Sequence, residues 1–254
     1  MRLLFLLPVF APLPSLLSWF AVLLVLGAGM VFSVRTGKLT VPGAATGGVL
    51  GVLLFLGAGF TGLALLGVFF LLGSAASAWK RADKQRLGLA EANQGRRTAY
   101  QALANAGVAS TAGLLSWLLP AHAPFFQLMV AGSLAAATAD TLSSELGNVY
   151  GRRYYHVLTF RPDVRGRDGV ISVEGTALGL VGSTLIASVY CLGLGWYQGF
   201  GWVVLAGAVG NLADSVLGAT LERKGVLSNN AVNTLNTLVG AGTAALCYVL
   251  WQRP

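Results

Sequence analysis

The sequence predicts an all-α fold, a polytopic bundle of about eight transmembrane helices that forms one integral membrane domain over residues 1–254. Three observations support this prediction: the composition is too apolar for a soluble protein, apolar segments of spanning length recur, and basic residues cluster in every second connection. Hydrophobic residues make up 55% of the chain and charged residues only 10%, whereas a soluble domain carries about 25% charge. The chain therefore lacks the charge that a water-exposed surface requires.

Apolar runs of spanning length can be followed along the whole chain. A helix needs about 20 apolar residues to cross the hydrocarbon core. Such runs predict helices over residues 13–34, 41–58, 60–79, 98–119, 124–147, 173–194, 199–222 and 229–251. Seven spans is the alternative count. The apolar stretch 3–10 is too short to cross a bilayer, and we expect it to lie at the interface or to extend the first helix, with a cleaved signal peptide as the competing interpretation.

Basic residues alternate between the connections. The chain has 17 Lys and Arg against 9 Asp and Glu, a formal net charge of +8. Fifteen of the 17 lie in loops near 35–40, 80–97, 148–172 and 223–228, and the intervening connections contain none. The positive-inside rule predicts that these four loops are cytoplasmic, in what we expect to be a bacterial or archaeal plasma membrane. The basic residues thus indicate topology, and no nucleic-acid partner is expected.

Five of the nine acidic residues lie within or at the ends of the apolar helices: Asp140, Glu145, Glu174, Asp214 and Glu222. An ionised group inside a bilayer is costly unless it is paired or lines a wet cavity, so the alternatives are a functional site and structural salt bridges or helix caps. Asp140 and Asp214 lie at matching depth, each about 15 Å from the basic end of its helix. Two such carboxylates can bind a divalent cation, and ligation by oxygen alone favours Mg²⁺ shared with substrate phosphates.

Polar and small residues form stripes on four helices, each in the half that adjoins a basic loop. The stripes comprise Asp140, Ser144, Gly147 and Gly151, bordered by Ser143; Asn211, Asp214, Gly218 and Glu222; Asn233, Asn236 and Gly240; and Arg97, Gln101 and Asn105. Close packing between membrane helices explains the small residues. It does not explain the acids, amides and arginine beside them, so we expect the four stripes to face a shared polar cavity.

Two loop segments have the composition of a phosphate site. NQGRR at 93–97 places a glycine and two arginines at the start of a helix, where free backbone N–H groups attract anions and arginine adds bidentate contacts. GRDGVISVEGT at 166–176 combines glycines with a helix start in the same way. The alternative for 93–97 is a basic anchor before a helix. No Walker A, Rossmann or protein-kinase motif occurs, and neither His122 nor His156 has neighbours of the zinc-binding type.

These motifs resemble those of known membrane kinases. Asp140, Ser143, Gly147 and Gly151 resemble the DxxAxxxGxxxG signature of CTP-dependent dolichol and phytol kinases, with serine in place of alanine. SVEGTALGL at 172–180 resembles their EGS segment, although the preceding lysine is missing. The fuller resemblance is to the integral membrane family that contains the plant phytyl-phosphate kinase and human transmembrane protein 19. It is carried by NQGRR with LANAG, the run that starts at Asp140, GVISVEGT, GNLADSVLGATLERKG and NAVNTLNTLVGA, and these segments cover most of 38–245.

The resemblance implies phosphoryl transfer from a nucleoside triphosphate, CTP in the related kinases, to an isoprenyl (phytyl-type) monophosphate at the cytoplasmic membrane face. We expect the isoprenyl tail to lie between helices, with an opening to the lipid. An isoprenol such as polyprenol or phytol is the alternative acceptor, and its hydroxyl would need Asp140 or Asp214 as a base. CDP-lipid-type nucleotidyl transfer is another alternative. The alternative that is not an enzyme is a transporter for small ions or lipids, because acidic residues inside the membrane also occur along transport routes.

Roles follow from the motifs and the resemblance together. Asp140, Asp214 and Arg97 are the candidate catalytic residues. The expected ligands of Mg²⁺ are Asp140, Glu145, Glu174 and Asp214. Binding of nucleotide and phosphate is assigned to Asn93, Arg96, Arg97, Ser143, Ser144, Gly147, Glu174, Gly175, Asn211, Lys224, Asn233 and Asn236.

Overall fold

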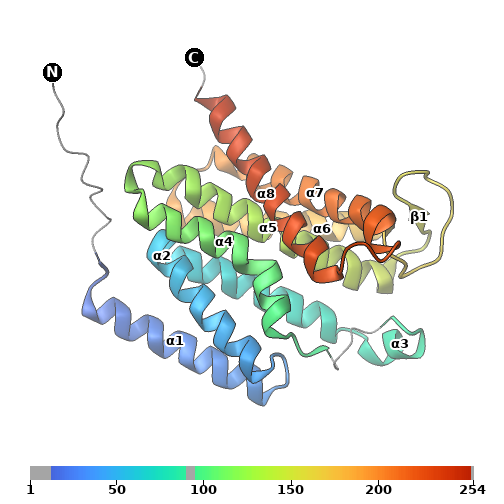
Figure 1. Cartoon of the computed structure of the whole chain (residues 1–254), viewed down its shortest axis with the longest axis horizontal. Helices are drawn as coiled ribbons and strands as arrows, with labels where there is room; N and C mark the ends of the chain where they lie inside the picture. Colours follow the sequence, from blue (N-terminus) through green and yellow to red (C-terminus); the bar gives the residue numbers. More distant parts are fainter. Residues whose placement is uncertain (1–12, 90–94, 253–254) are drawn as a thin grey trace.

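A computed structural model describes residues 13–89 and 95–252 as a bundle of long helices with one small hairpin of strands (Figure 1). The helices are α1 (Leu16–Arg35), α2 (Val41–Ala78), α3 (Arg81–Arg86), α4 (Ala99–Leu118), α5 (Ala123–Tyr150), α6 (Val173–Leu194), α7 (Gly199–Leu217) and α8 (Asn229–Trp251). A 3-10 turn, η2 (Pro120–His122), precedes α5, and a π-helical turn, η3 (Gly218–Glu222), extends α7. Strands β1 (Tyr155–His156) and β2 (Val170–Ile171) pair antiparallel.

The predicted all-α membrane bundle is confirmed. Six helices of the described chain are long and apolar enough to cross a membrane. The 20-residue α4 is not among them, since Gln101 and Asn105 interrupt its apolar sequence. Two predicted helices, 41–58 and 60–79, are the two arms of α2. With these arms counted separately and α4 included, the described residues contain eight long segments at the predicted positions.

The two arms of α2 meet at a sharp bend. Gly59 has φ 59° and ψ −148°, a conformation that glycine adopts readily and other residues do not. The chain folds back there (Figure 1), which brings the Leu66 side chain against Gly51. Both ends of α2 consequently reach the start of α4: the Thr40 N–H donates to the Arg97 carbonyl at 3.1 Å, and Gly73 lies against the Arg97 guanidinium.

Helix α5 forms the centre of the bundle. It packs against α2, α4, α6, α7 and α8, and its membrane-length segment is 72% buried, more than that of any other described span. Its middle is a run of small residues, Ala135–Ala137, with no exposed surface. Small side chains let neighbouring helices approach closely in a membrane protein. This central position surrounds Asp140 and the residues after it with neighbouring helices.

Helix α1 lies at the edge of the bundle and packs chiefly against α2. Only 11% of its spanning segment is buried, and large apolar side chains such as Leu16 and Leu17 are exposed. The connections that contain the basic residues gather at one end of the bundle, where α3 and β1 lie in Figure 1. The alternation of charge along the sequence predicts this arrangement.

Candidate functional site

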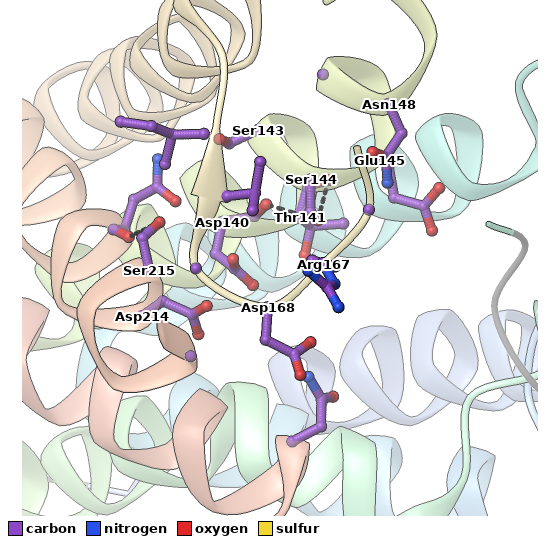
Figure 2. Close-up of a pocket in the computed structure, with 18 of the residues that line it drawn as sticks. Asp140, Thr141, Ser143, Ser144, Glu145, Asn148, Arg167, Asp168, Asp214 and Ser215 are labelled. Carbon is purple, nitrogen blue, oxygen red and sulfur yellow. Dashed lines mark hydrogen bonds between the residues drawn. The ribbon is translucent and has the colours of Figure 1, made fainter. Parts of the chain in front are cut away.

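A polar cavity of about 380 Å³ lies at the basic end of the bundle. Its walls come from α4, α5, α7, η3 and α8, and the segment Gly166–Ser172 runs across it (Figure 2). Each of the four polar stripes contributes lining residues to this cavity. The acids of the cavity are Asp140, Glu145, Asp168, Asp214 and Glu222, and its basic residues are Arg97 and Arg167.

Asp140 of α5 and Asp214 of α7 face each other across this cavity (Figure 2). Their carboxyl groups are close enough to interact directly. The Asn236 amide of α8 donates a hydrogen bond to Asp214, with 3.4 Å between Asn236 Nδ2 and Asp214 Oδ2. Asn236 is fully buried, and its Oδ1 atom has no hydrogen-bond partner in the described structure. Asn236 therefore positions Asp214 and does not itself line the cavity.

The start of α4 forms the opposite wall. The Thr98 and Gln101 side chains form a capping box that begins the helix: the Thr98 N–H donates to Gln101 Oε1 at 2.8 Å, and the Gln101 N–H donates to Thr98 Oγ1 at 3.4 Å. Arg97, just before this cap, is only 9% exposed. Its guanidinium stacks over the Phe69 ring, 5.3 Å from the centroid, and its charge acts on Asp140. A buried cation thus stands close to the pair of aspartates.

A clamp made by Arg223 holds the loop over the cavity. The Arg223 guanidinium donates to the Asp168 carbonyl at 2.7 and 3.1 Å and to Asp163 Oδ2 at 3.0 Å. The Val164 N–H donates to Asp163 Oδ1 at 2.7 Å. This backbone hydrogen bond, together with Arg223, lowers the pKa of Asp163 below its ordinary value. The clamp keeps Asp168 over the aspartate pair (Figure 2).

Glu145 has a structural partner. It forms a buried ion pair with Lys84 of α3, and Figure 2 shows its side chain directed away from Asp140 and Asp214. Lys84 is 1% exposed and also donates to the Ala76 and Ser77 carbonyls, each at 3.0 Å. Glu145 borders the cavity, but its charge is already neutralised. The pair fastens the end of α2 and the short α3 to α5.

Two glycines of the kinase-like motifs meet at a helix crossing. A Cβ atom on Gly147 of α5 would lie 3.0 Å from the Cα of Gly175 in α6, so neither position accepts a larger residue without moving a helix. Glu174 accepts a hydrogen bond from the Arg152 N–H at 3.4 Å. Neither Glu174 nor Gly175 lines the polar cavity. Gly147 does line the cavity, and its contact with Gly175 packs α5 on α6.

The other predicted residues divide into two groups. Those that line the cavity are Ser143, Ser144, Asn211 and Asn233. Arg96 and Lys224 lie outside it, and Asn93 falls outside the described residues. Arg167 and Asp168 also line the cavity. The sequence does not predict them as site residues, although the glycines of segment 166–176 predict a phosphate site in the same loop. Within the described residues, no three Asp, Glu, His or Cys side chains are close enough together to hold a metal ion.

The cavity is acidic in net charge. Glu145 is paired with Lys84, and Arg167 is paired with Asp163 at 3.5 Å. Four acids, Asp140, Asp168, Asp214 and Glu222, then remain against Arg97. In the described part of the chain, none of these four acids takes part in an ion pair within 4.0 Å. Such a cavity attracts cations, and it accepts a polyphosphate only together with a cation that offsets the repulsion.

Comparison with known protein families identifies the family of this chain. The family model described as integral membrane protein DUF92 matches residues 23–241. The chain belongs to this family. DUF92 proteins are integral membrane proteins, in agreement with the membrane-length helices, and the matched range includes every residue that lines the polar cavity.

Relatives of this DUF92 protein occur in plants, cyanobacteria and archaea. The chloroplast protein VTE6 of Arabidopsis thaliana is 34% identical over 215 residues, which is 82% of this chain and 65% of VTE6. Uncharacterized membrane proteins of Synechocystis and Methanocaldococcus jannaschii are 33% and 36% identical, over 77% and 79% of the chain and 77% and 82% of their own lengths. The chain thus spans about two thirds of VTE6 and more of the other two. No solved structure matches it.

Proposed function

We propose that this protein is a membrane kinase that transfers the γ-phosphoryl group of CTP to an isoprenyl monophosphate and so produces an isoprenyl diphosphate. The observation that carries the proposal is the pair Asp140 and Asp214, which face each other in an acidic cavity beside the buried Arg97. Membership of the DUF92 family and the 34% identity to VTE6 support it. So does the resemblance of the Asp140 motif to CTP-dependent dolichol and phytol kinases.

Magnesium fits the residues of the cavity. Mg²⁺ is bound by one or two carboxylates and completes its shell with water and substrate phosphates, so a pair of aspartates suffices where a nucleotide is also present. Asp140 and Asp214 would hold the ion, and Asp168 and Glu222 also line the cavity. Bound Mg²⁺ would offset the charge of the transferred phosphoryl group. Glu145 is paired with Lys84 and Glu174 lies outside the cavity, so we no longer propose them as ligands.

The protein's own groups bind and orient the reactants in this proposal. Arg97 binds the acceptor phosphate, and the Asn211 and Asn233 amides and the Ser143 hydroxyl orient the donor. An oxygen of the acceptor monophosphate forms a bond to the γ-phosphorus, and the bond from that phosphorus to the bridging oxygen breaks, which releases the nucleoside diphosphate. The acceptor is already ionised at neutral pH, so no general base is required. Catalysis then depends on positioning and charge.

The basic end of the bundle faces the cytoplasm in this proposal, because loops rich in Lys and Arg stay on that side. CTP is then available to the cavity directly, in a bacterial or archaeal plasma membrane. The transporter alternative requires a polar route through the bundle. The described residues at the opposite end pack aromatic rings together, among them Trp196, Trp202 and Tyr248. None of these residues lines the polar cavity.

One assay tests the proposal and its alternatives together. Purified protein in detergent receives Mg²⁺, one of CTP, ATP or UTP, and either a prenyl alcohol or a prenyl monophosphate, and the products are resolved by mass spectrometry. We expect prenyl diphosphate and CDP from CTP and a prenyl monophosphate. Monophosphate formed from an alcohol would favour the isoprenol kinase, and pyrophosphate release with a CMP-linked lipid would favour nucleotidyl transfer. Absence of lipid diphosphate from every monophosphate would refute the proposal.

A further inference from the structure

A second cavity of about 300 Å³ lies between α1, the two arms of α2 and α4. Its lining is almost entirely apolar. Representative residues are Val25 and Met30 of α1, Leu50 and Phe70 of α2, and Ala102 and Ala106 of α4. Its volume is at the lower end of the range of about 300–1,000 Å³ that small-molecule sites occupy.

The apolar and polar cavities share one wall. Arg97, Gln101 and Asn105, successive members of one stripe on α4, line both of them. Phe69, which stacks against the Arg97 guanidinium, also lines the apolar cavity. A buried cation therefore stands at the junction, with hydrocarbon side chains on one side and the aspartate pair on the other. This arrangement complements a molecule with an anionic head and a hydrocarbon tail.

The apolar cavity has open space beside two glycines of α2, and one of its walls is a helix that is mostly exposed. A Cβ atom added to Gly47 or Gly67, one on each arm of α2, would meet no atom within 4 Å. The outer wall is α1, the least buried of the described membrane-length helices. A lipid tail could therefore reach the cavity from the side of the bilayer without crossing the polar end.

We propose that this cavity holds the isoprenyl chain of the acceptor, with its phosphate against Arg97. The inference rests on the proposed function, because it assigns the tail of that reaction's acceptor. The nucleotide is the wrong occupant: its base and ribose would lose their hydrogen bonds to water in a wall of hydrocarbon side chains, which is costly. The acceptor places its apolar part in the apolar cavity and its charged part at the junction, directly opposite Asp140 and Asp214.

Filling the cavity tests the assignment. Gly47→Phe and Gly67→Phe each put a ring into its open space. We expect kcat/KM for a prenyl monophosphate of four isoprene units to fall about tenfold or more, while kcat/KM for a single unit and the KM for CTP change less than about twofold. Gly242→Phe on α8 is the matched control, since Gly242 also has no atom near its Cβ position but lines neither cavity. Equal losses for long and short acceptors, or no loss for either, would overturn the inference.

Photolabelling gives a readout that does not depend on turnover. The probe is a prenyl monophosphate with a diazirine at the tail end, irradiated with the purified protein and mapped by mass spectrometry. We expect the label on residues of α1, α2 and α4 such as Met30 and Phe70, with competition by unmodified prenyl monophosphate and loss of labelling in Arg97→Gln. Labelling confined to α5–α8 or to the outer surface, in a protein that still makes diphosphate, would overturn the cavity assignment alone. No turnover with any acceptor would instead refute the proposed function.

Discussion

Replacement of Lys84 should strongly destabilise the protein. Lys84 and Glu145 are 1% and 7% exposed, so Lys84→Met leaves a carboxylate without a partner in a buried place. Breaking a buried ion pair from one side costs about 3–5 kcal/mol. The Ala76 and Ser77 carbonyls also lose their donor, so the upper part of this range applies. For a chain of this size we expect the melting temperature to fall on the order of 10 °C.

The assay is thermal unfolding of purified variants in one detergent. The double variant Lys84→Met/Glu145→Leu removes both charges, so it should recover most of the loss, because apolar replacement of a buried pair is often neutral. Arg86→Met is the matched control, since the Arg86–Asp83 pair is exposed and 4.0 Å long and such pairs contribute about 0–1 kcal/mol. A Glu145→Gln variant that melts like the wild type but loses magnesium-dependent transfer would refute this reasoning and restore Glu145 as a metal ligand.

Three further predictions concern the polar cavity. A Cβ atom at Gly73 would lie 3.0 Å from Arg97 Nη1, so Gly73→Ala should shift the guanidinium and lower kcat/KM for the acceptor about tenfold, whereas Gly242→Ala should not. Because the pKa of Asp163 is lowered from 3.8, the clamp with Arg223 should persist at neutral and mildly acidic pH. It should be lost as the pH falls through the lowered value, which amide exchange of residues 163–169 measures; protection that already disappears near pH 5 would contradict this. Removal of Mg²⁺ with EDTA should abolish transfer and its re-addition restore it, and transfer that survives chelation would exclude the metal.

The positions of the membrane-length helices and the matching depth of Asp140 and Asp214 could be predicted from the sequence for a physical reason. Lipid excludes polar groups so strongly that the apolar runs and the isolated acids can be read directly from residue order. Depth in a helix follows from counting residues, and so Asp140 and Asp214 could be matched before the fold was known. The bend at Gly59 was also visible as a break between two apolar runs, although its backbone geometry was not.

The partners of individual side chains could not be predicted in the same way. Lys84 and Glu145 are 61 residues apart, and nothing in the spacing tells which of six basic residues in the 80–97 loop reaches the buried acid. Glu174 lies in the first turn of α6, within the kinase-like motif, but the direction of its side chain depends on how α6 crosses α5 at Gly175. Asp168 lines the cavity in a loop that is held by Arg223 of a distant segment and by the Val157 N–H on the Gly169 carbonyl. Each of these outcomes depends on long-range packing.

The central claim is that the protein transfers a phosphoryl group from a nucleotide to an isoprenyl phosphate and that Asp140 and Asp214 are required for this reaction. The most direct measurement follows the labelled γ-phosphate of CTP into prenyl diphosphate with wild-type protein, Asp140→Asn, Asp214→Asn and the exposed control Asp83→Asn. We expect each of the two cavity variants to lose transfer by about 100-fold or more while melting as a folded protein, and the control to retain it. Near-normal transfer by either cavity variant would contradict the account.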